Sequence, residues 1–586
     1  MAKLVDTKPP ASSLSPLQAE RLAFRPQLPS VLTGPHSMVE GERRECVAAH
    51  SSVCAMFPHL SGSEAGTGGT LRLMRLVPSN QDDNGGAQGA PLRLGVLFSG
   101  GQASGGHNVI IGLHDYLQRW HPGSTLLGFL NGPRGVMQNN YKLLAPEELV
   151  VDSYRNQGGF HMIASGRDKI EKADQLAAAE KTCMDEKLDG IVIIGGDDSN
   201  TNAAVMAEHF LARGVNTRVV GVPKTIDGDL KTPDVPCSFG FDTACKVYSE
   251  SIGNICIDSA SAKKYYHFIK LMGRAASHIT LECALQTRPQ IALICEEVAA
   301  HRCSLKDVVY QIADVVAQRA QQGKNYGVVL IPEGLIEHMH DVSALIAELN
   351  ELLAQGVNVA DQADVSAHLS PESADVFDHL PVSIRCEMLE ERDPHGNVQV
   401  SHIETEKLIM KLVEGELARR KAHGQYSGKF SAINHFFGYE GRCSLPSNFD
   451  ATYCNALGQA AAALVAAGQT GLMATVSNLQ HAASEWTVGG TPLLAMMHLE
   501  RRSGRDKPVI KKALVDMEGP AMRAFSASRA TWAAGDCFRV PGPIQYQGHC
   551  ADTTTLTLEL ELNEGKAISL AGAESTNGAG PHAREE

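Results

Sequence analysis

The chain has 586 residues, of which 43% are hydrophobic and 20% are charged. A single hydrophobic core seldom extends through so long a chain, so we expect two or more packed domains. This composition excludes wholesale disorder, and the formal net charge of -14 argues against nucleic acid as the main partner. An anionic substrate would therefore need a local pocket of basic side chains.

The fourteen cysteines contain no CxxC pair, and many lie within apolar runs. This pattern is typical of free thiols in a reducing compartment and offers no zinc site. No apolar run approaches about eighteen residues, and residues 1–10 lack the apolar segment of a signal peptide. We therefore expect a cytoplasmic protein without a membrane partner.

The first regular pattern follows a long extension. Residues 1–90 are rich in proline, serine and glycine, which indicates an N-terminal extension that is partly disordered. The sequence RLGVLFSGGQASGGHNVIIGL, which starts at Arg93, then predicts a strand, a glycine-rich turn and a helix. Backbone N–H groups near Gly101 could hold a phosphate at this turn, although neither the GxGxxG nor the GxxxxGK[ST] motif is present. A plain helix-packing turn is the alternative.

Two acidic loops follow the next buried strands. The apolar runs at 188–194 and 218–222 are short and rich in β-branched residues, which predicts parallel strands of an α/β sheet. They lead into GGDDS at 195–199 and PKTIDGD at 223–229, at the sheet edge where such proteins bind ligands. From Asn202 onward the sequence predicts a helix, whose N-terminus would favour anions.

The two loops could supply metal and acid–base chemistry together. Asp197 is the candidate ligand for Mg²⁺, which prefers a carboxylate or two together with phosphate oxygens. Lys224, Thr225, Asp227 and Asp229 could supply a base, a second acid and a phosphate partner. An ordinary acidic turn is the alternative for GGDDS alone.

Strand and helix patterns alternate along the rest of the chain, which predicts βαβ units and a parallel sheet. Strands are expected at 125–130, 267–271, 290–295 and 326–331, helices at 239–256, 304–322, 404–421 and 451–467, and a mainly helical insertion at 337–403. Arg274 falls just past a strand end, where a bidentate phosphate contact is available. Tyr439 and Arg442 could present a hydroxyl and a guanidinium to one phosphate. Arg134 and Arg167 could touch phosphate, but we interpret both as solvated surface arginines, and Phe436 and Phe437 as core residues.

These motifs, taken in order, resemble a known family. GGQASGGHN, IVIIGGDDSNTNA, VPKTIDGDL, SFGFDTA, KKYYHFIKLMGR, PEG and HFFGYEGRCSLPSNFD together resemble the long form of the diphosphate-dependent 6-phosphofructokinases, within the phosphofructokinase family. The resemblance runs from about residue 92 to residue 547. It implies two α/β domains with mainly parallel sheets, a cleft between them and helical insertions. It also implies reversible transfer of a phosphoryl group from diphosphate to O1 of fructose 6-phosphate, in glycolysis or gluconeogenesis.

The resemblance carries roles over to matching residues. Asp227 would be the base, Asp229 would assist near the metal, Asp197 would bind Mg²⁺ and Gly101 would bind the diphosphate. Arg274 would be both catalytic and sugar-binding. The full set expected to hold fructose 6-phosphate is Thr225, Ile226, Asp227, Met272, Gly273, Arg274, Glu333, Tyr439, Glu440, Gly441 and Arg442, with Lys264 and Tyr265 reaching the neighbouring subunit's site. A solvated turn is the alternative for Lys264.

Two catalytic positions set the donor in this resemblance. Where relatives that use ATP have glycines, this chain has Asp198 and Lys224, which is the diphosphate-dependent pattern. An Asp198 carboxylate would repel the α-phosphate of ATP, and the Lys224 ammonium would stabilise a leaving orthophosphate. An ATP-dependent phosphofructokinase and a non-catalytic regulatory subunit are the alternatives.

The resemblance also suggests the assembly and the domain boundaries. The shared sugar site implies a homodimer or a higher oligomer, and paired catalytic and regulatory chains in the family also allow a heteromer with a paralogous chain. We expect a diphosphate- and magnesium-binding domain at 91–260 and a sugar-binding domain at 261–450. A C-terminal helical region at 451–550 and a polar tail at 551–586 would follow.

Overall fold

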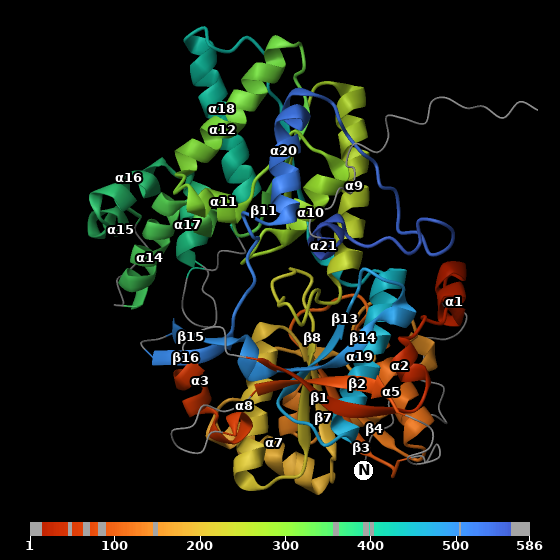
Figure 1. Cartoon of the computed structure of the whole chain (residues 1–586). Helices are drawn as coiled ribbons and strands as arrows, with labels where there is room; N and C mark the ends of the chain where they lie inside the picture. The colour runs from red at the N-terminus through yellow and green to blue at the C-terminus, as the bar shows by residue number, and fades with distance from the viewer. Residues whose placement is uncertain are drawn as a thin grey trace, which may run out of the picture.

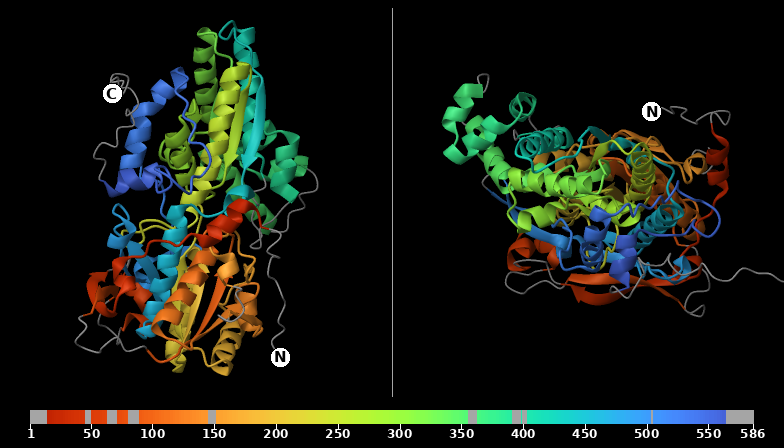
Figure 2. Two further views of the ribbon diagram at one scale, coloured as in Figure 1. Left: turned by 90° about the vertical axis from the view of Figure 1, so that its right-hand side faces the viewer. Right: turned by 90° about the horizontal axis from the view of Figure 1, so that it is seen from above.

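The chain folds into two α/β units, each built on its own sheet (Figure 1). The computed structural model describes residues 14–44, 50–62, 71–79, 89–144, 151–354, 362–390, 398, 403–502 and 505–563. Both units are α/β and their central strands are parallel, so the expected fold class is confirmed. Seen from the side and from above, the sheet of the first unit lies beneath the helices of the second (Figure 2).

The first unit contains a ten-stranded mixed sheet in the order β1-β2-β14-β13-β8-β7-β3-β4-β5, with β6 paired to β3. Its strands are β1 (His36–Arg44), β2 (Leu71–Pro78), β3 (Arg93–Ser99), β4 (Thr125–Phe129), β5 (Tyr141–Leu143), β6 (Ser165–Gly166), β7 (Gly190–Gly195), β8 (Arg218–Pro223), β13 (Leu472–Ser477) and β14 (Thr487–Pro492). The strands β4, β3, β7, β8 and β13 run parallel, whereas β1, β2, β14 and β5 are paired antiparallel.

Helices cover both faces of this sheet. They are α5 (Gly106–Trp120), α6 (Pro133–Met137), α7 (Ala173–Asp185), α8 (Asp197–Arg213) and α19 (Asn448–Ala466). Every residue of β7 is buried, with Val192 and Ile194 in one hydrophobic cluster and Ile191 and Ile193 in another. Successive side chains of a strand point to opposite faces, so a strand covered on both sides must be apolar throughout. This explains the continuous apolar runs in the sequence.

The N-terminal extension contributes to this unit. In its described parts, β1 and β2 extend the sheet, and α1 (Pro16–Ala23), α2 (Ser30–Thr33), α3 (His50–Met56) and α4 (Pro58–Ser61) pack nearby. Arg21 is buried and donates a hydrogen bond from Nη1 to Oδ1 of Asn448, at 2.8 Å. The domain boundary at residue 90 stays a prediction.

The second unit contains a four-stranded parallel sheet in the order β10-β11-β9-β12. Its strands are β9 (Tyr266–Leu271), β10 (Ile291–Ala292), β11 (Gly327–Pro332) and β12 (Ala432–Phe437). Outside residues 335–390 its helices include α9 (Phe241–Ala262), α10 (His278–Thr287), α11 (Cys295–Ala300), α12 (Leu305–Gln321), α18 (Thr405–Ala422), α20 (Pro520–Ala534) and α21 (Leu556–Leu562). The interpretation of Phe436 as a core residue is wrong, because β12 is an edge strand and this side chain is 41% exposed.

The region expected to be a helical insertion is mainly helical where the structure describes it. Its helices are α13 (Leu335–His338), α14 (His340–Ala354), α15 (Gln362–His368), α16 (Pro371–His379) and α17 (Val382–Glu390). By contrast, the prediction of a helical region at 451–550 is wrong in part. The strands β13 and β14 lie inside the first sheet, and β15 (Met497–Arg502) pairs with β16 (Arg505–Ile510) in a hairpin. β13 and β14 are six residues each, a length typical of strands rather than helices.

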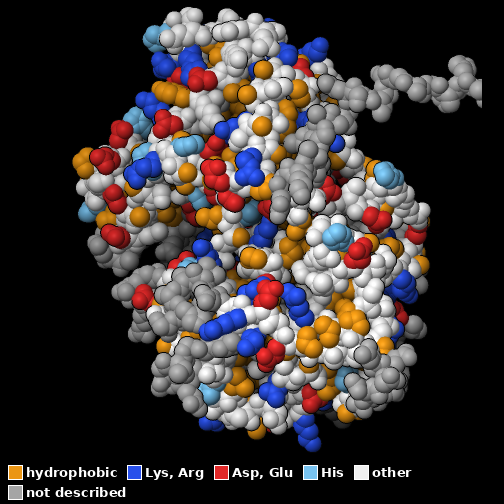
Figure 3. Space-filling model, viewed as in Figure 1, with side chains coloured by type: hydrophobic (Ala, Val, Ile, Leu, Met, Phe, Trp, Pro, Cys, Tyr) orange, Lys and Arg blue, Asp and Glu red, His pale blue; other side chains and the backbone are white. Residues whose placement is uncertain are grey.

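Within the part of the chain that the structure describes, none of the helices combines the length and apolar character that a membrane crossing requires. The buried Cys183, Cys237, Cys245, Cys256, Cys283, Cys295 and Cys454 are free thiols. On the face shown in Figure 3, basic and acidic side chains lie side by side around the level where the two units meet.

Candidate active site

Three parallel strands bring their carboxyl ends together in register. Ser99 at the end of β3 lies beside Gly195 of β7, which lies beside Pro223 of β8. The buried side chain of Asn200 ties the last two loops together, because its Nδ2 donates to the carbonyl oxygens of Gly195, at 2.6 Å, and Val222, at 3.4 Å. The glycine-rich turn, GGDDS and PKTIDGD therefore meet at one edge of the sheet, as the sequence predicted.

The acidic loop is also the start of a helix. The helix α8 begins at Asp197, five residues earlier than the sequence pattern indicated, so Asp197 and Asp198 both lie in its first turn. Carboxylates are favourable there because the helix dipole presents partial positive charge. The Asp198 side chain is 56% exposed and its Oδ1 lies 3.9 Å from Nζ of Lys169.

A cavity of about 310 Å³ opens between these loops. Its charged lining comprises five basic and five acidic residues, which are Arg167, Lys169, Lys224, Arg442, Lys512, Asp168, Asp197, Asp198, Asp227 and Asp229. A chain with a net charge of -14 thus contains a site of balanced charge. Such a site can accept a polyanion together with a cation.

Glycines leave room for a ligand at the turn after β3. Gly100 has a φ of +88°, which favours glycine, and a Cβ added there would lie 3.3 Å from Nζ of Lys224. A Cβ at Gly101 would lie 3.6 Å from Cζ of Arg442 and 3.8 Å from Nη2 of Arg167. Three cationic groups therefore surround a backbone without side chains, and this arrangement suits a phosphate.

Lys224 is buried beside these glycines. Its side chain follows β8, and the residue is 5% exposed. Burial lowers the pKa of Lys224 to about 8, while the negative charges of Asp227 and Asp197 oppose that change. The ammonium form is thus kept by its acidic neighbours at neutral pH.

Burial has the opposite effect on the two carboxylates of the same loop. It raises the pKa of Asp227, and the charge of Glu333 adds to the effect. Burial, together with the charges of Asp227 and Asp197, raises the pKa of Asp229 to about 6. Acids with raised pKa values in a cavity are candidates for proton transfer.

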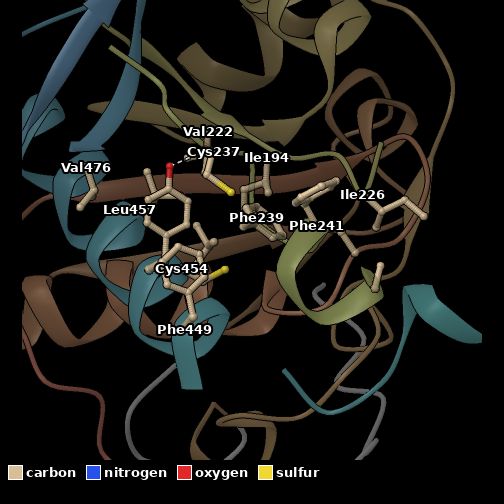
Figure 4. Close-up of a cluster of buried hydrophobic side chains, with 14 of the residues drawn as sticks. Ile194, Val222, Ile226, Cys237, Phe239, Phe241, Phe449, Cys454, Leu457 and Val476 are labelled. Carbon is tan, nitrogen blue, oxygen red and sulfur yellow. Dashed lines mark hydrogen bonds between the residues drawn. The ribbon is translucent and has the colours of Figure 1, made fainter. Parts of the chain in front are cut away.

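The PKTIDGD loop is anchored in the protein core. The Ile226 side chain is 4% exposed and packs with Phe239 and Phe241 in the cluster shown in Figure 4. Any contact of Ile226 with a substrate would therefore come from its main chain. Its anchoring holds the neighbouring residues Thr225 and Asp227 at the cavity, where both are lining residues.

Two loops of the second sheet approach the same site. Met272, Gly273 and Arg274 follow β9, and Glu333 follows the adjacent β11. The N–H of Glu333 donates to the carbonyl of Leu271 at 2.9 Å. Burial raises the pKa of the Glu333 carboxyl, although the positive charges of Lys270, Arg442 and Arg274 oppose it. Because the charge of Glu333 adds to the raised pKa of Asp227, the two loops lie within electrostatic reach of each other.

Arg442 joins the two halves of the site. It lies in the short helix Tyr439–Arg442, and its guanidinium stacks over the Tyr439 ring with Cζ 4.9 Å from the centroid. A Cβ at Gly441 would lie 2.5 Å from the Tyr248 ring, so only glycine fits there. Glu440 and Tyr439 are exposed beside it. The same arginine reaches Gly101, so it can contact a phosphate held at that turn.

Lys264 and Tyr265 are not part of this cavity. They precede β9, whereas Arg274 follows it, so a six-residue strand of about 20 Å separates them. Nζ of Lys264 lies 4.8 Å from the centroid of the Tyr265 ring. Their position at the far end of the strand excludes contact with a ligand in the cavity of their own chain.

Sequence reasoning missed two cations in the cavity. Arg167 is exposed, as expected of a solvated arginine, but it also lines the cavity, which the sequence reading left out of the site. The available signal was the SGR triplet after a glycine-bounded loop, because the strand of that loop, β6, pairs with β3. Lys512 also lines the cavity, with Nζ 3.6 Å from Oδ2 of Asp197, and no local pattern pointed to it. Arg134 is exposed and pairs with Asp168, as expected of a surface arginine.

The carboxylates in the cavity suit a magnesium ion that takes most of its ligands from phosphate groups. Among the described residues no group of three or more histidine, cysteine or acidic side chains is arranged to hold a metal. Asp197 and Asp229 both line the cavity, and Asp197 is close enough for its charge to raise the pKa of Asp229. Magnesium is commonly bound by one or two carboxylates and by substrate phosphates, so this donor set fits.

Residues 93–465 match the phosphofructokinase family. The chain belongs to that family. One relative is the beta subunit of pyrophosphate--fructose 6-phosphate 1-phosphotransferase from Solanum tuberosum. It is 53% identical, and the match covers 94% of this chain and 95% of the relative. The Porphyromonas gingivalis enzyme of that name is 48% identical, over 94% and 99%. The alpha subunit from Solanum tuberosum is 43% identical, over 94% and 89%.

A solved structure supports the phosphofructokinase fold independently. The pyrophosphate-dependent phosphofructokinase from Nitrosospira multiformis superposes with a TM-score of 0.50 at 16% identity, covering 78% of this chain and 95% of its own. At that identity the likeness concerns the fold alone.

Proposed function

We propose that this chain transfers a phosphoryl group reversibly from diphosphate to O1 of fructose 6-phosphate, giving fructose 1,6-bisphosphate and orthophosphate. The observation that carries the proposal is the cavity in which the Gly101 turn, the buried Lys224 and the acid Asp227 meet. The sequence comparisons support the proposal, because relatives named for this reaction are about half identical to this chain over nearly its full length.

The proposed mechanism divides the work between two residues of one loop. Asp227 accepts the proton of the sugar O1 hydroxyl as O1 bonds to the terminal phosphorus of diphosphate. The bond from that phosphorus to the bridging oxygen breaks, and orthophosphate leaves with the bonding electron pair. Lys224 stabilises the charge that develops on the leaving phosphate, and Arg442 with the Gly101 turn holds the phosphates in line.

A magnesium ion completes the proposed site. Asp197 would hold it with help from Asp229, and the remaining ligands would be diphosphate oxygens and water. When bound, the ion neutralises negative charge on the phosphates. The protein then contributes orientation: α8 fixes Asp197 in its first turn, and Asn200 fixes the loop before it.

Asp198 is proposed to select diphosphate over ATP. A carboxylate about 4 Å from the α-phosphate of ATP would cost about 4 kcal/mol at an effective dielectric constant of ~20, which is about a thousandfold in affinity. Because the Asp198 side chain is 56% exposed, solvent screening makes this an upper limit. Diphosphate has no group at that position, so it is not repelled.

The sugar site is proposed to be shared between two copies. Arg274, Glu333 and Arg442 would bind fructose 6-phosphate from within one chain, and Lys264 and Tyr265 would reach the site of the neighbour. At the far end of β9, Lys264 is exposed and Tyr265 is half-buried, which leaves the lysine accessible to a neighbouring chain. The assembly would be at least a homodimer, or a heteromer with a paralogous chain. The free thiols support a reducing compartment such as the cytoplasm.

Two alternatives make different predictions. An ATP-dependent enzyme would need space where Asp198 lies, and a regulatory subunit would not need the intact set of Asp197, Lys224 and Asp227. The test is the rate of fructose 1,6-bisphosphate formation by purified protein supplied with fructose 6-phosphate, Mg²⁺ and either diphosphate or ATP. We expect turnover with diphosphate alone. Turnover with ATP alone, or with neither donor, would reject the proposal.

A further inference from the structure

Lys512 lies on a short segment that connects the two units. Residues 511–515, here named the strap, lead from β16 of the first-unit hairpin to α20 of the second unit (Figure 1). The strap lies outside the span 93–465 that matches the family. Lys512 therefore lies outside the residues that match the family.

Hydrogen bonds fix the strap to both units. The N–H of Ala513 donates to the carbonyl of Asp229 at 2.7 Å, and Nε2 of His278 donates to the carbonyl of Ala513 at 2.9 Å. The N–H of Val515 donates to Oε1 of the buried Glu296 at 2.9 Å. Because Asp229 belongs to the acidic loop and the other partners to α10 and α11, the strap is positioned relative to the cavity itself.

The two lysines of the strap differ in what they reach. Lys512 lines the cavity, and its Nζ lies 3.6 Å from Oδ2 of Asp197. Lys511 is exposed and is not among the lining residues, as expected when successive side chains of an extended segment point to opposite sides. The chain thus provides a neighbouring lysine of the same charge outside the site.

The ion pair between Lys512 and Asp197 is not explained by a contribution to folding stability. The side chains of Lys512 and Asp197 are 43% and 27% exposed, and ion pairs in such positions contribute little to stability. Their separation of 3.6 Å also exceeds the ~2.8 Å of a charge-assisted hydrogen bond. An ammonium has three donors, so it can bind an anion while Asp197 remains its neighbour.

We propose that Lys512 is a donor-binding residue, whose ammonium binds oxygens of diphosphate in one direction of the reaction and of orthophosphate in the other. This inference rests on the proposed function. Lys512 would act on the Asp197 side of the cavity and would neutralise charge that the donor carries both before and during transfer. Its loss should therefore weaken donor affinity more than kcat.

The experiment compares Lys512→Met with the matched control Lys511→Met. The Kd for diphosphate is measured by titration calorimetry in excess Mg²⁺, and the Kd for fructose 6-phosphate is measured separately. We expect the Lys512 variant to bind diphosphate on the order of tenfold to a hundredfold more weakly, as for a lost charge-assisted contact. The sugar affinity of both variants, and the diphosphate affinity of the control, should stay within about twofold of the parent. Lys512→Arg should restore part of the affinity.

Three outcomes would overturn the inference. The first is an unchanged Kd for diphosphate in Lys512→Met, when the unsubstituted protein turns over diphosphate. The second is an equal loss of sugar affinity, because that would show a structural role of the strap. The third is an equal effect in the Lys511 control. A parent that neither binds diphosphate nor turns it over would instead reject the proposed function, so the two failures are distinguishable.

Discussion

The Asp229 carboxyl shows how the site trades stability for chemistry. Its pKa is raised to about 6 from 3.8 by burial and by nearby negative charge, so the folded state disfavours its charged form. The stabilising contribution of the neutral form is complete below about pH 4 and is lost as the pH rises through about 6. The residue thus destabilises the metal-free protein at neutral pH.

A neutral substitute should reverse that effect. We predict that Asp229→Asn, measured without Mg²⁺ or diphosphate at pH 7.5, raises the free energy of unfolding by about 2 to 3 kcal/mol. The melting temperature should rise by a few degrees, and the gain should disappear near pH 4. A variant that is less stable than the parent at pH 7.5 would show that the carboxylate is held by favourable contacts instead.

The donor-selecting pair can be tested by a four-variant cycle. Asp198→Gly should permit measurable turnover with ATP, because the carboxylate no longer excludes the α-phosphate. The same variant should reduce turnover with diphosphate. Lys224→Gly should lower kcat for diphosphate more than it raises KM, since it acts on charge that develops in the transition state. Both residues line one cavity, so the effects should not add in the double variant. The measurement is kcat/KM for each donor in all four proteins.

This assignment can also fail clearly. If Asp198→Gly gains no ATP activity and keeps its diphosphate rate, electrostatic exclusion is wrong and other residues select the donor.

At the scale of elements, the loops after β9 and β11 depend on a close backbone approach. A Cβ at Gly334 would lie 1.9 Å from the carbonyl oxygen of Arg274, so any side chain would push the two loops apart. We predict that Gly334→Ala raises KM for fructose 6-phosphate by about tenfold or more, while the Kd for diphosphate changes little. Overpacking should also cost about 1 to 3 kcal/mol of stability.

Gly415 provides the matched control. It lies in α18, and a Cβ there would have nothing within 4 Å, so Gly415→Ala should leave KM unchanged and be neutral or slightly stabilising. Steady-state kinetics on both variants decide the matter. A normal sugar KM in Gly334→Ala would show that the Arg274 and Glu333 loops do not bind the sugar.

Elements with a local signal were predictable from the sequence. The buried runs of β7 and β8 and the glycine-rich turn after β3 are each encoded in a few adjacent residues, and so are the loops that they carry. The position of Lys512 is different, because it depends on a strap held by residues distant in the chain, Asp229, His278 and Glu296. The inclusion of β2 beside β14 in the first sheet likewise joins distant segments, and no local pattern records it.

At the scale of the whole molecule, a shared sugar site predicts complementation between two damaged chains. Asp227→Ala removes the base, and Lys264→Ala removes the residue proposed to reach the neighbour. In a mixed dimer, one site would combine the intact Asp227 of one chain with the intact Lys264 of the other. We expect mixtures to recover activity that neither variant shows alone at low fructose 6-phosphate. Mixtures that gain nothing after subunit exchange would place Lys264 outside the shared site.

The central claim is that diphosphate and orthophosphate, rather than ATP and ADP, are the phosphoryl donor and product. The most direct test runs the reaction backwards, with purified protein, fructose 1,6-bisphosphate, orthophosphate and Mg²⁺, and follows the products by ³¹P NMR without nucleotide. We predict that diphosphate and fructose 6-phosphate appear in equal amounts, and that Asp227→Ala forms them on the order of 10² to 10⁴ times more slowly. The absence of diphosphate, or product formation only after ADP is added, would contradict the account.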